Sequence, residues 1–288
     1  MKRNNRNCRS GENLIEEMNQ TAVPHGGVAV WHLGQASVAL KTRDVMFYID
    51  PYLSDSLNEG GAWPRKFDPP LQPEGVTNAG YVLITHDHGD HLDPVSLRGI
   101  ESASPNARFI CPAPAVERLQ SLGIPDQRII EARAGEWVHD AGVSVLPVAC
   151  QHEEFSVDEN GDHAYLGYIV KTDGILFYHA GDTILHSELI EALQPFSIDL
   201  AFLPINGRDY SRAEKGIAGN MGFREAADLT EAVQMDLVIP IHYDLFPFNA
   251  DNPAYFVDYL YAHYPGQCFK MMVPGERILH LGSGVNSR

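Results

Sequence analysis

Side chains of the types that bind divalent metal ions are concentrated in one short segment of this sequence. The segment HDHGDH spans residues 86–91 and follows the apolar run YVLIT. A loop that leaves a strand end can turn alternate side chains toward one point. Neutral imidazoles with a carboxylate suit zinc, manganese or iron better than calcium or magnesium. We interpret this HxHxDH pattern as the first part of a metal site.

One loop cannot complete the coordination of two metal ions, so further ligands are required at the ends of later strands. His152 follows the apolar run VSVLPVAC, Asp182 follows ILFYHAG, and His242 follows DLVIPI. Three separate runs that each end in a suitable ligand favour a metal centre over the alternative, in which these are hydrogen-bonded polar residues at strand ends. The predicted ligands are His86, His88, Asp90, His91, His152, Asp182 and His242.

Four further residues lie beside the predicted ligands. Asp50 ends the run VMFYID and is expected to accept a hydrogen bond from a ligand imidazole and fix its tautomer, the alternative being the opening of an Asp-Pro turn. The side chain of Asp87 alternates away from its neighbours in the loop, which leaves it a structural or proton-handling role. His179 lies in an apolar strand and either packs in the core or supports a ligand. Asp244, two residues after His242, has the same ambiguity as Asp87.

A basic loop after the run DLAFLPI is expected to emerge on the same rim as the later ligands. Arg208, Arg212 and Lys215 place three cations within residues 208–215, in a chain that has only 21 lysines and arginines. Arginine can hold a phosphate or carboxylate through two hydrogen bonds. The alternative is a solvated loop whose charges are offset by Asp209 and Glu214. The residues that we expect to contact an anionic substrate are Asn206, Arg208, Arg212 and Lys215.

The elements that must position these residues form two groups of strands, each followed by helices. Strand-like runs at residues 28–33, 37–42 and 45–50 predict an antiparallel meander, and residues 51–80 predict a long loop near the site. From residue 81 onward strands alternate with helices, expected at residues 113–122, 185–193, 223–233 and 253–264. Asp93-Pro94 predicts a helix N-cap directly after the ligand loop. This order indicates an α/β fold of two face-to-face sheets with helices outside, an αββα sandwich.

The composition of the chain limits its domain organisation, the state of its cysteines and the partners that it can bind. With 288 residues and 44% hydrophobic content, we expect one domain at residues 26–288 after an N-terminal tail at residues 1–25, with a short helix at 12–18. Four scattered cysteines without a CxxC spacing predict free thiols. A net charge of -17 argues against nucleic acid and anionic membranes as partners, and no apolar run is long enough to span a bilayer. We expect a cytoplasmic homo-oligomer that acts on a small anionic molecule.

In order along the chain, the HxHxDH segment, His152, Gly181-Asp182-Thr183 and His242 resemble the motifs of the metallo-β-lactamase superfamily, from residue 28 to about residue 281. The resemblance implies that fold and a binuclear centre. It assigns three histidines to the first metal, three ligands to the second and Asp182 as a bridge. The first set is His86, His88 and His152, and the second is Asp90, His91 and His242. The segments WHLGQAS and IPIHYDLF, and more weakly GNMGF, resemble the L-ascorbate-6-phosphate lactonase group of metal-dependent hydrolases.

The expected chemistry follows from such a centre. Two ions bridged by Asp182 would lower the pKa of a shared water toward neutrality and supply hydroxide without a dedicated protein base, so Asp90, Asp182 and His242 are the expected catalytic residues. The resemblance favours hydrolysis of a lactone of a small sugar acid, with or without a phosphate group, such as L-ascorbate 6-phosphate, with manganese or zinc. The alternatives are a phosphodiesterase of the same superfamily, a metal-binding scaffold without turnover, and a diiron redox protein.

Overall fold

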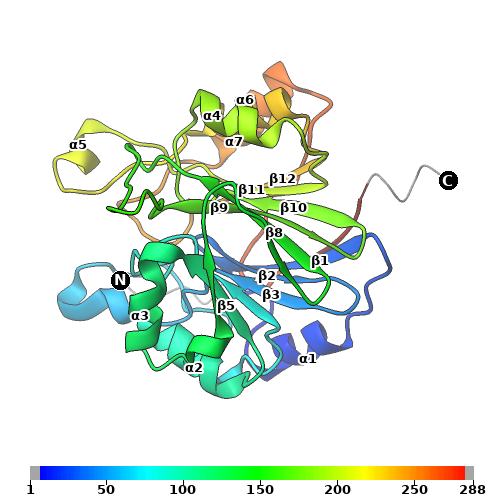
Figure 1. Cartoon of the computed structure of the whole chain (residues 1–288). Coiled ribbons are helices and arrows are strands. Elements are labelled where there is room, and N and C mark those ends of the chain that lie inside the picture. The colour runs from blue at the N-terminus through cyan, green and yellow to red at the C-terminus, as the bar shows by residue number, and fades with distance from the viewer. Residues whose placement is uncertain (1–6, 283–288) are drawn as a thin grey trace.

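The strands of this chain gather into two sheets that pack face to face, with helices on the outer face of each (Figure 1). The computed structural model describes residues 7–282, and within them each sheet has seven strands. The αββα sandwich predicted from the sequence is therefore confirmed. It forms because most strand runs are apolar on both faces, so one face packs against the other sheet and the opposite face needs a cover of helices.

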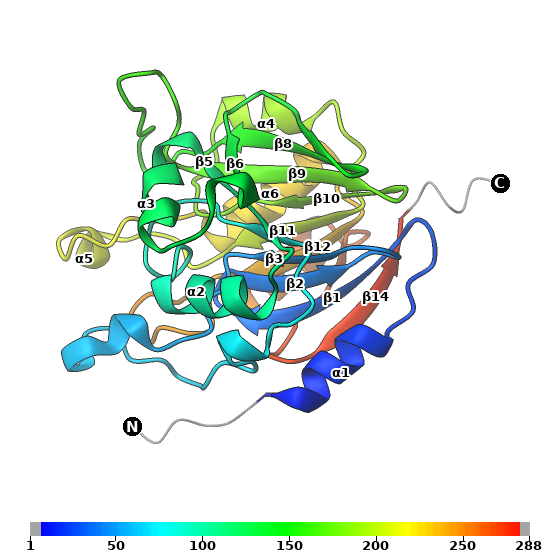
Figure 2. The same ribbon diagram turned by 60° about the horizontal axis from the view of Figure 1, so that its bottom comes forward.

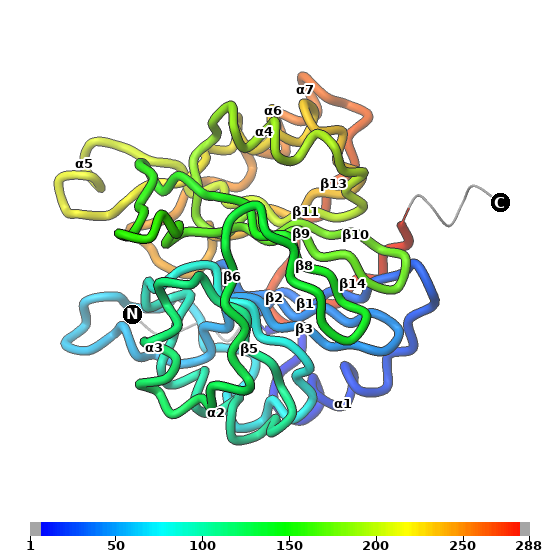
Figure 3. Tube along the Cα trace, in the orientation of Figure 1, coloured from blue at the N-terminus to red at the C-terminus, as the bar shows by residue number. Residues whose placement is uncertain are grey.

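The first sheet begins as an antiparallel meander and continues with parallel strands. β1, β2 and β3 pair antiparallel, as predicted, whereas β3 to β6 run parallel. The last strand, β14, returns to pair with β1, so red and blue segments lie side by side in the same layer (Figure 3). In sheet order the strands are β14 Arg277–Leu281, β1 Gly27–Gly34, β2 Ser37–Lys41, β3 Met46–Ile49, β4 Tyr81–Leu83, β5 Arg108–Pro112 and β6 Ile129–Ala132.

The second sheet has the same mixture of strand directions. β7 to β10 pair antiparallel, and β10 to β13 run parallel. In sheet order the strands are β13 Cys268–Phe269, β12 Leu237–Ile241, β11 Leu200–Pro204, β10 Ile175–His179, β9 Leu166–Thr172, β8 Val143–Ala149 and β7 Val138–Asp140.

Helices cover the two outer faces. The helices α1 to α3 lie over the first sheet (Figure 2), and α4, α6 and α7 lie over the second, while the short α5 stands apart at one side (Figure 1). Their bounds are α1 Glu12–Gln20, α2 Pro94–Ala103, α3 Val116–Ser121, α4 Ser187–Leu193, α5 Tyr210–Ala213, α6 Phe223–Val233 and α7 Ala254–His263. Short 3-10 helices lie at Ser56–Gly61, Pro73–Gly75, Ala113–Ala115 and Asp126–Arg128. No helix among the described residues is long and apolar enough to cross a membrane.

Alternation along the strands divides the apolar side chains between separate cores. On β1, Val28 and Val30 pack between the two sheets, whereas Ala29 and Trp31 pack under the helices of the first layer. Successive side chains of a strand point to opposite faces, so this period of two follows directly from strand geometry. A third core lies between the second sheet and its own helices, α4, α6 and α7.

The N-terminal segment packs against the first layer. Leu14 and Met18, on the inner side of α1, are fully buried, and the indole nitrogen of Trp31 donates a hydrogen bond to Glu17 at 2.9 Å. Residues 7–25 of the predicted tail are thus attached to the sandwich. Residues 1–6 of that tail lie outside the described residues.

Strand direction explains where polar side chains can gather. In the first sheet β1, β3 and β4 run in one direction, and in the second β8, β10 and β12 share a direction. The carboxyl ends of strands that run in the same direction lie at the same edge of a sheet. The segments that follow β4, β8, β10 and β12 contain all seven predicted ligands.

Candidate metal centre

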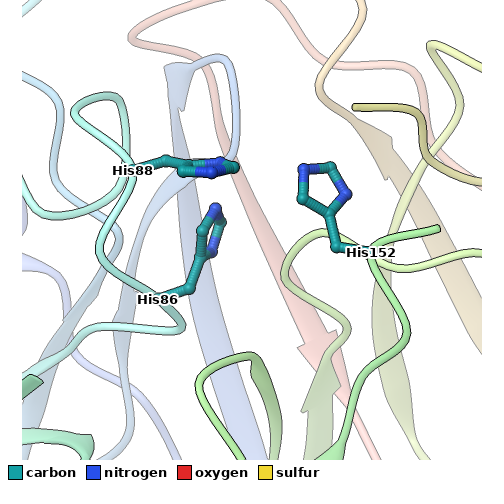
Figure 4. Close-up of side chains that lie close together, drawn as sticks. All are labelled: His86, His88 and His152. Carbon is teal, nitrogen blue, oxygen red and sulfur yellow. The ribbon is translucent and has the colours of Figure 1, made fainter. Parts of the chain in front are cut away.

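Three histidines from the two sheets face a common point. His86 and His88 come from the loop after β4, and His152 comes from the segment after β8 on the opposite side (Figure 4). One ring nitrogen from each residue lies within 4.8 Å of the others. The ring centroids of His86 and His88 are 4.6 Å apart, and those of His88 and His152 are 5.2 Å apart. This spacing lets three imidazoles share one metal ion.

The other four predicted ligands extend this group. Asp90, His91 and His242 form a second set of donors within 4.8 Å of one another, and His86, His91 and Asp182 form a third. His242 Nε2 lies 3.2 Å from Asp182 Oδ2 and 3.6 Å from Asp90 Oδ2, and His91 Nε2 lies 3.4 Å from Asp182 Oδ1. Asp182 therefore lies between the two histidine-rich sets, where a single carboxylate can reach both.

The backbone before Asp182 is shaped by a close approach of the two sheets. Gly181 has a φ of +59°, and a Cβ at this position would lie 2.8 Å from the Cβ of Thr85. Glycine tolerates both constraints. The Gly181 N–H donates to His179 Nδ1 at 3.1 Å, and His179 Nε2 lies 2.9 Å from the carbonyl oxygen of Ala36. The structure thus places His179 in the core and beneath the turn that carries Asp182.

Asp50 links the strand ends of the first sheet to a predicted ligand. It is fully buried, and its carboxylate accepts hydrogen bonds from the backbone N–H of Thr85 at 2.8 Å and from the Thr85 hydroxyl at 2.7 Å. His91 Nδ1 lies 2.7 Å from Asp50 Oδ2. A carboxylate in this position accepts the hydrogen on Nδ1, so the lone pair of Nε2 faces the centre.

Gln35 is a residue at the centre to which the sequence analysis gave no role. Its side-chain amide nitrogen, Nε2, donates to Asp90 Oδ2 at 2.9 Å and lies 3.0 Å from His242 Nε2. The backbone N–H of Gln35 donates to Asp244 Oδ1 at 2.9 Å, and His32 Nε2 lies 2.8 Å from Asp244 Oδ2. Asp244 therefore holds the turn between β1 and β2. The sequence signal was present, because Gln35 follows a strand that ends at this edge.

Tyr165 is a second such residue. It directly precedes β9, and its phenol oxygen lies 3.3 Å from His88 Nε2. Its ring centroid is 5.0 Å from that of His86 and 5.3 Å from that of His152. Burial, followed by the charges of Asp87 and Asp182, raises the pKa of this phenol. No sequence signal marked Tyr165, since the segment before β9 has neither a period nor a motif.

Asp87 is exposed to solvent, in agreement with the expected alternation away from the ligands.

The basic loop after β11 differs from the expectation that its residues contact an anionic substrate. Asn206 is fully buried, and its amide contacts the side chains of Asn249 and Asn220. A buried side chain with internal partners on both polar groups has no free group for a substrate, so the structure disfavours the predicted substrate contact of Asn206.

The two arginines of the loop also have internal partners. Arg208 donates to both carboxylate oxygens of Glu225 at 2.8 Å and 2.8 Å. Arg212 donates to Asp209 at 2.5 Å and to the carbonyl oxygen of Asn206 at 2.8 Å. Lys215 is exposed on the loop after α5. This geometry favours the alternative interpretation, a surface loop whose charges are offset, with Glu225 in place of Glu214 as one of the acids.

The electrostatics of the centre differ between its two sides. Burial and the neighbouring His91 lower the pKa of His86 well below its usual value, which keeps that imidazole neutral. Burial alone would lower the pKa of His91, but Asp182, Asp50 and Asp90 outweigh it and raise the pKa well above its usual value. Burial would raise the pKa of Asp182, but His242 and His91 hold it well below its usual value. Cations are therefore attracted to the side with the carboxylates, where a metal ion competes with protons.

Several donor atoms at the centre have no hydrogen-bond partner within the protein and are available to bind metal ions. His86 Nε2, His91 Nε2 and Asp182 Oδ1 are buried without any hydrogen-bond partner. A buried polar atom without a partner costs about 1–3 kcal/mol, so three of them at one point require an explanation. Nitrogen and carboxylate donors of this kind suit zinc, manganese or iron. The residues present therefore fit divalent metal ions.

Comparison with known proteins agrees with this geometry. Residues 46–243 match the beta-lactamase superfamily domain. A UPF0173 metal-dependent hydrolase of Geobacillus sp. (strain WCH70) is 31% identical over 254 residues, which cover 86% of this chain and 98% of that protein. Another, of Thermococcus kodakarensis, is 31% identical over 80% of this chain and 90% of its own length. In fold, the chain is similar to the metallo hydrolase Igni18 of Ignicoccus hospitalis, with a TM-score of 0.69, 22% identity, and 88% and 98% of the two chains covered.

Proposed function

This chain belongs to the beta-lactamase superfamily and, within it, to the UPF0173 metal-dependent hydrolase family, and from that premise we propose that it is a lactonase. In this proposal the protein holds two divalent ions, manganese or zinc, and hydrolyses the cyclic ester of a small sugar acid. Membership of the family supports the assignment of this chain as a metal-dependent hydrolase. The ester specificity and the pair of ions are our own inference.

The donor sets divide the ligands between the two ions. One ion would be held by three histidines, the other by two histidines and one aspartate, and Asp182 would contact both. The first set is His86, His88 and His152, and the second is Asp90, His91 and His242. When bound, such ions supply Lewis acidity, which polarises an ester carbonyl and activates water near neutral pH.

One observation supports a lactone as the substrate. The two segments that resemble the ascorbate lactonases, WHLGQAS and IPIHYDLF, meet at the centre rather than elsewhere in the fold. Gln35 of the first segment contacts Asp90 and His242, while Asp244 of the second holds both the backbone of Gln35 and the ring of His32. The resemblance thus lies in residues that orient the ligands.

The side chains around the ligands have the tasks of orientation and of excluding water. Asp50 holds His91 through Nδ1, so that Nε2 points inward. Leu57 packs so closely on the ligand loop that a Cβ at Gly89 would lie 2.5 Å from its Cδ2. An apolar side chain over this loop lowers the local dielectric and strengthens the electrostatic interactions beneath it.

The charge distribution favours a neutral lactone over a phosphorylated one such as L-ascorbate 6-phosphate. Arg208 and Arg212 are engaged with Glu225 and Asp209, so their charges are already offset. The net charge of -17 further disfavours long anionic polymers such as nucleic acid. The proposed partner is therefore a small molecule.

The test is a substrate screen on metal-free protein reconstituted with manganese or with zinc. The substrates are a neutral sugar lactone, a phosphorylated sugar lactone and a bis-aryl phosphodiester. We expect hydrolysis of the neutral lactone only when metal is present, and at least tenfold lower kcat/KM for the phosphodiester, a difference of about 1.4 kcal/mol in transition-state binding. Cleavage of the phosphodiester with every lactone left intact would make the protein a phosphodiesterase. No turnover of any substrate with both metals bound would support a scaffold.

A further inference from the structure

A phenol stands among the three histidines of the first proposed metal site. The ring of Tyr165 lies 5.0 Å from His86, 5.5 Å from His88 and 5.3 Å from His152, measured between centroids. Its hydroxyl oxygen lies 3.3 Å from His88 Nε2. Tyr165 is only partly buried, so the protein does not close its side chain off from solvent.

The backbone of Tyr165 is fixed from both sheets. Its carbonyl oxygen accepts a hydrogen bond from the N–H of Cys150 at 3.0 Å, and the N–H of Leu166 donates to the carbonyl oxygen of Thr85 at 3.0 Å. Thr85 directly precedes His86, and Cys150 lies two residues before His152. The segments that carry the first-site histidines thus also position the phenol, which is the preorganisation that a hydrogen-bond donor at a reaction centre requires.

The hydrogen of the phenol needs an acceptor once a metal ion is bound. If His88 binds the metal through Nε2, the lone pair of that nitrogen is used and cannot accept from Tyr165. If His88 binds through Nδ1, Nε2 carries the ring hydrogen and donates to the phenol oxygen, since a neutral imidazole has one N–H. In both cases the hydrogen of the phenol is left for another group. It stays on the oxygen near neutral pH, because the ordinary pKa of tyrosine is about 10.

We propose that Tyr165 donates this hydrogen bond to the carbonyl oxygen of the bound ester and stabilises the negative charge that develops there. The hydrogen remains on the phenol throughout, so no proton is transferred. The assignment of an ester rests on the proposed function, whereas the donation to an oxygen beside the first metal site rests on the geometry of Tyr165. A phenol that only steadies the ring of His88 is the competing explanation.

The test compares Tyr165→Phe with Tyr261→Phe, which removes a hydroxyl from an exposed tyrosine on α7. Three quantities are measured on metal-loaded protein: metal ions per chain, the Kd for inorganic phosphate by calorimetry, and kcat and KM with a neutral sugar lactone. Phosphate serves as a probe because its oxygens accept hydrogen bonds as an oxyanion does. The control variant should match the wild type in all three.

For Tyr165→Phe we expect unchanged metal content and a Kd for phosphate raised about tenfold or more, as for the loss of a hydrogen bond to a charged group. We also expect kcat to fall about 100-fold with KM within about threefold, as for an oxyanion donor. The proposal is overturned if Tyr165→Phe binds phosphate as the wild type does, or if it loses a metal ion, which would assign the phenol to holding His88. A wild type that hydrolyses no lactone would remove the proposed substrate, and the phosphate comparison would still decide the role of Tyr165.

Discussion

The substitution Asp50→Asn should weaken the second metal site while leaving the fold in place. Asp50 is fully buried and accepts three hydrogen bonds, two from Thr85 and one from His91 Nδ1. Asparagine has the same shape and keeps an oxygen for the backbone N–H of Thr85. Its NH2 group can donate to the Thr85 hydroxyl oxygen. It cannot accept the hydrogen of His91, because an amide nitrogen is only a donor.

The expected magnitude follows from that one lost interaction. Facing an NH2 group, His91 favours the tautomer with its hydrogen on Nε2, the nitrogen that points to the centre. Metal binding then requires the other tautomer, with its Nδ1 hydrogen opposed by the amide. A hydrogen bond to a charged group contributes about 1.5–3 kcal/mol, which corresponds to about 10- to 150-fold in affinity for the metal. The free energy of unfolding of the metal-free protein should fall by only about 1–2 kcal/mol, since two of three hydrogen bonds remain.

The assay is competition for metal with a chromogenic chelator, combined with urea denaturation of metal-free protein. Asp44→Asn is the matched control, because Asp44 is an exposed carboxylate with its side chain 72% accessible. This variant should bind both metal ions with the affinities of the wild type. If Asp50→Asn binds two ions as tightly as the wild type, the tautomer of His91 is not set by Asp50 and the reasoning is refuted.

Three further substitutions test other parts of the structure. Leu14→Ala should lower the free energy of unfolding by about 2–5 kcal/mol in urea without changing metal content, because Leu14 is fully buried in the first core; an unchanged midpoint would mean that α1 is not part of the folded domain. Gly181→Ala should lower both stability and metal content, since its φ is +59° and Thr85 leaves no room for a Cβ. Arg208→Ala should change KM for neutral and phosphorylated lactones by the same factor, because Arg208 is paired with Glu225; a rise confined to the phosphorylated lactone would restore its role in anion binding.

The parts of the fold that were predictable are those governed by local rules. The helix expected at residues 223–233 is α6, with the same bounds, and Asp93 caps α2 by accepting from the backbone of Val95 and Ser96. Hydrophobic period and capping chemistry are written in neighbouring residues, so they can be identified without the tertiary structure. The gathering of the seven predicted ligands was also predictable, because each follows an apolar run and strands of one direction end at one edge.

Other features depend on contacts between residues distant in sequence. Gln35 reaches Asp90 and His242, which lie 55 and 207 positions away, so its place after β1 could indicate the edge of the sheet but not these two contacts. Tyr165 lies in an irregular segment and is positioned by the sheets on either side of it. The sequence could count the cations of the loop, but it could not show that Glu225, 17 residues after Arg208, accepts both of its hydrogen bonds.

The central claim is that seven side chains at one edge of the sandwich hold two divalent ions. Elemental analysis of metal ions per chain tests it directly, on the wild type, on His242→Ala and on His139→Ala, which removes an exposed histidine from β7. His242 belongs to the second donor set only, whereas His86, His88 and His152 remain intact in that variant. We expect two ions per chain in the wild type and in His139→Ala, and one in His242→Ala. A purified wild type that binds no metal at stoichiometric level, or a His242→Ala variant that retains two ions, would contradict the account.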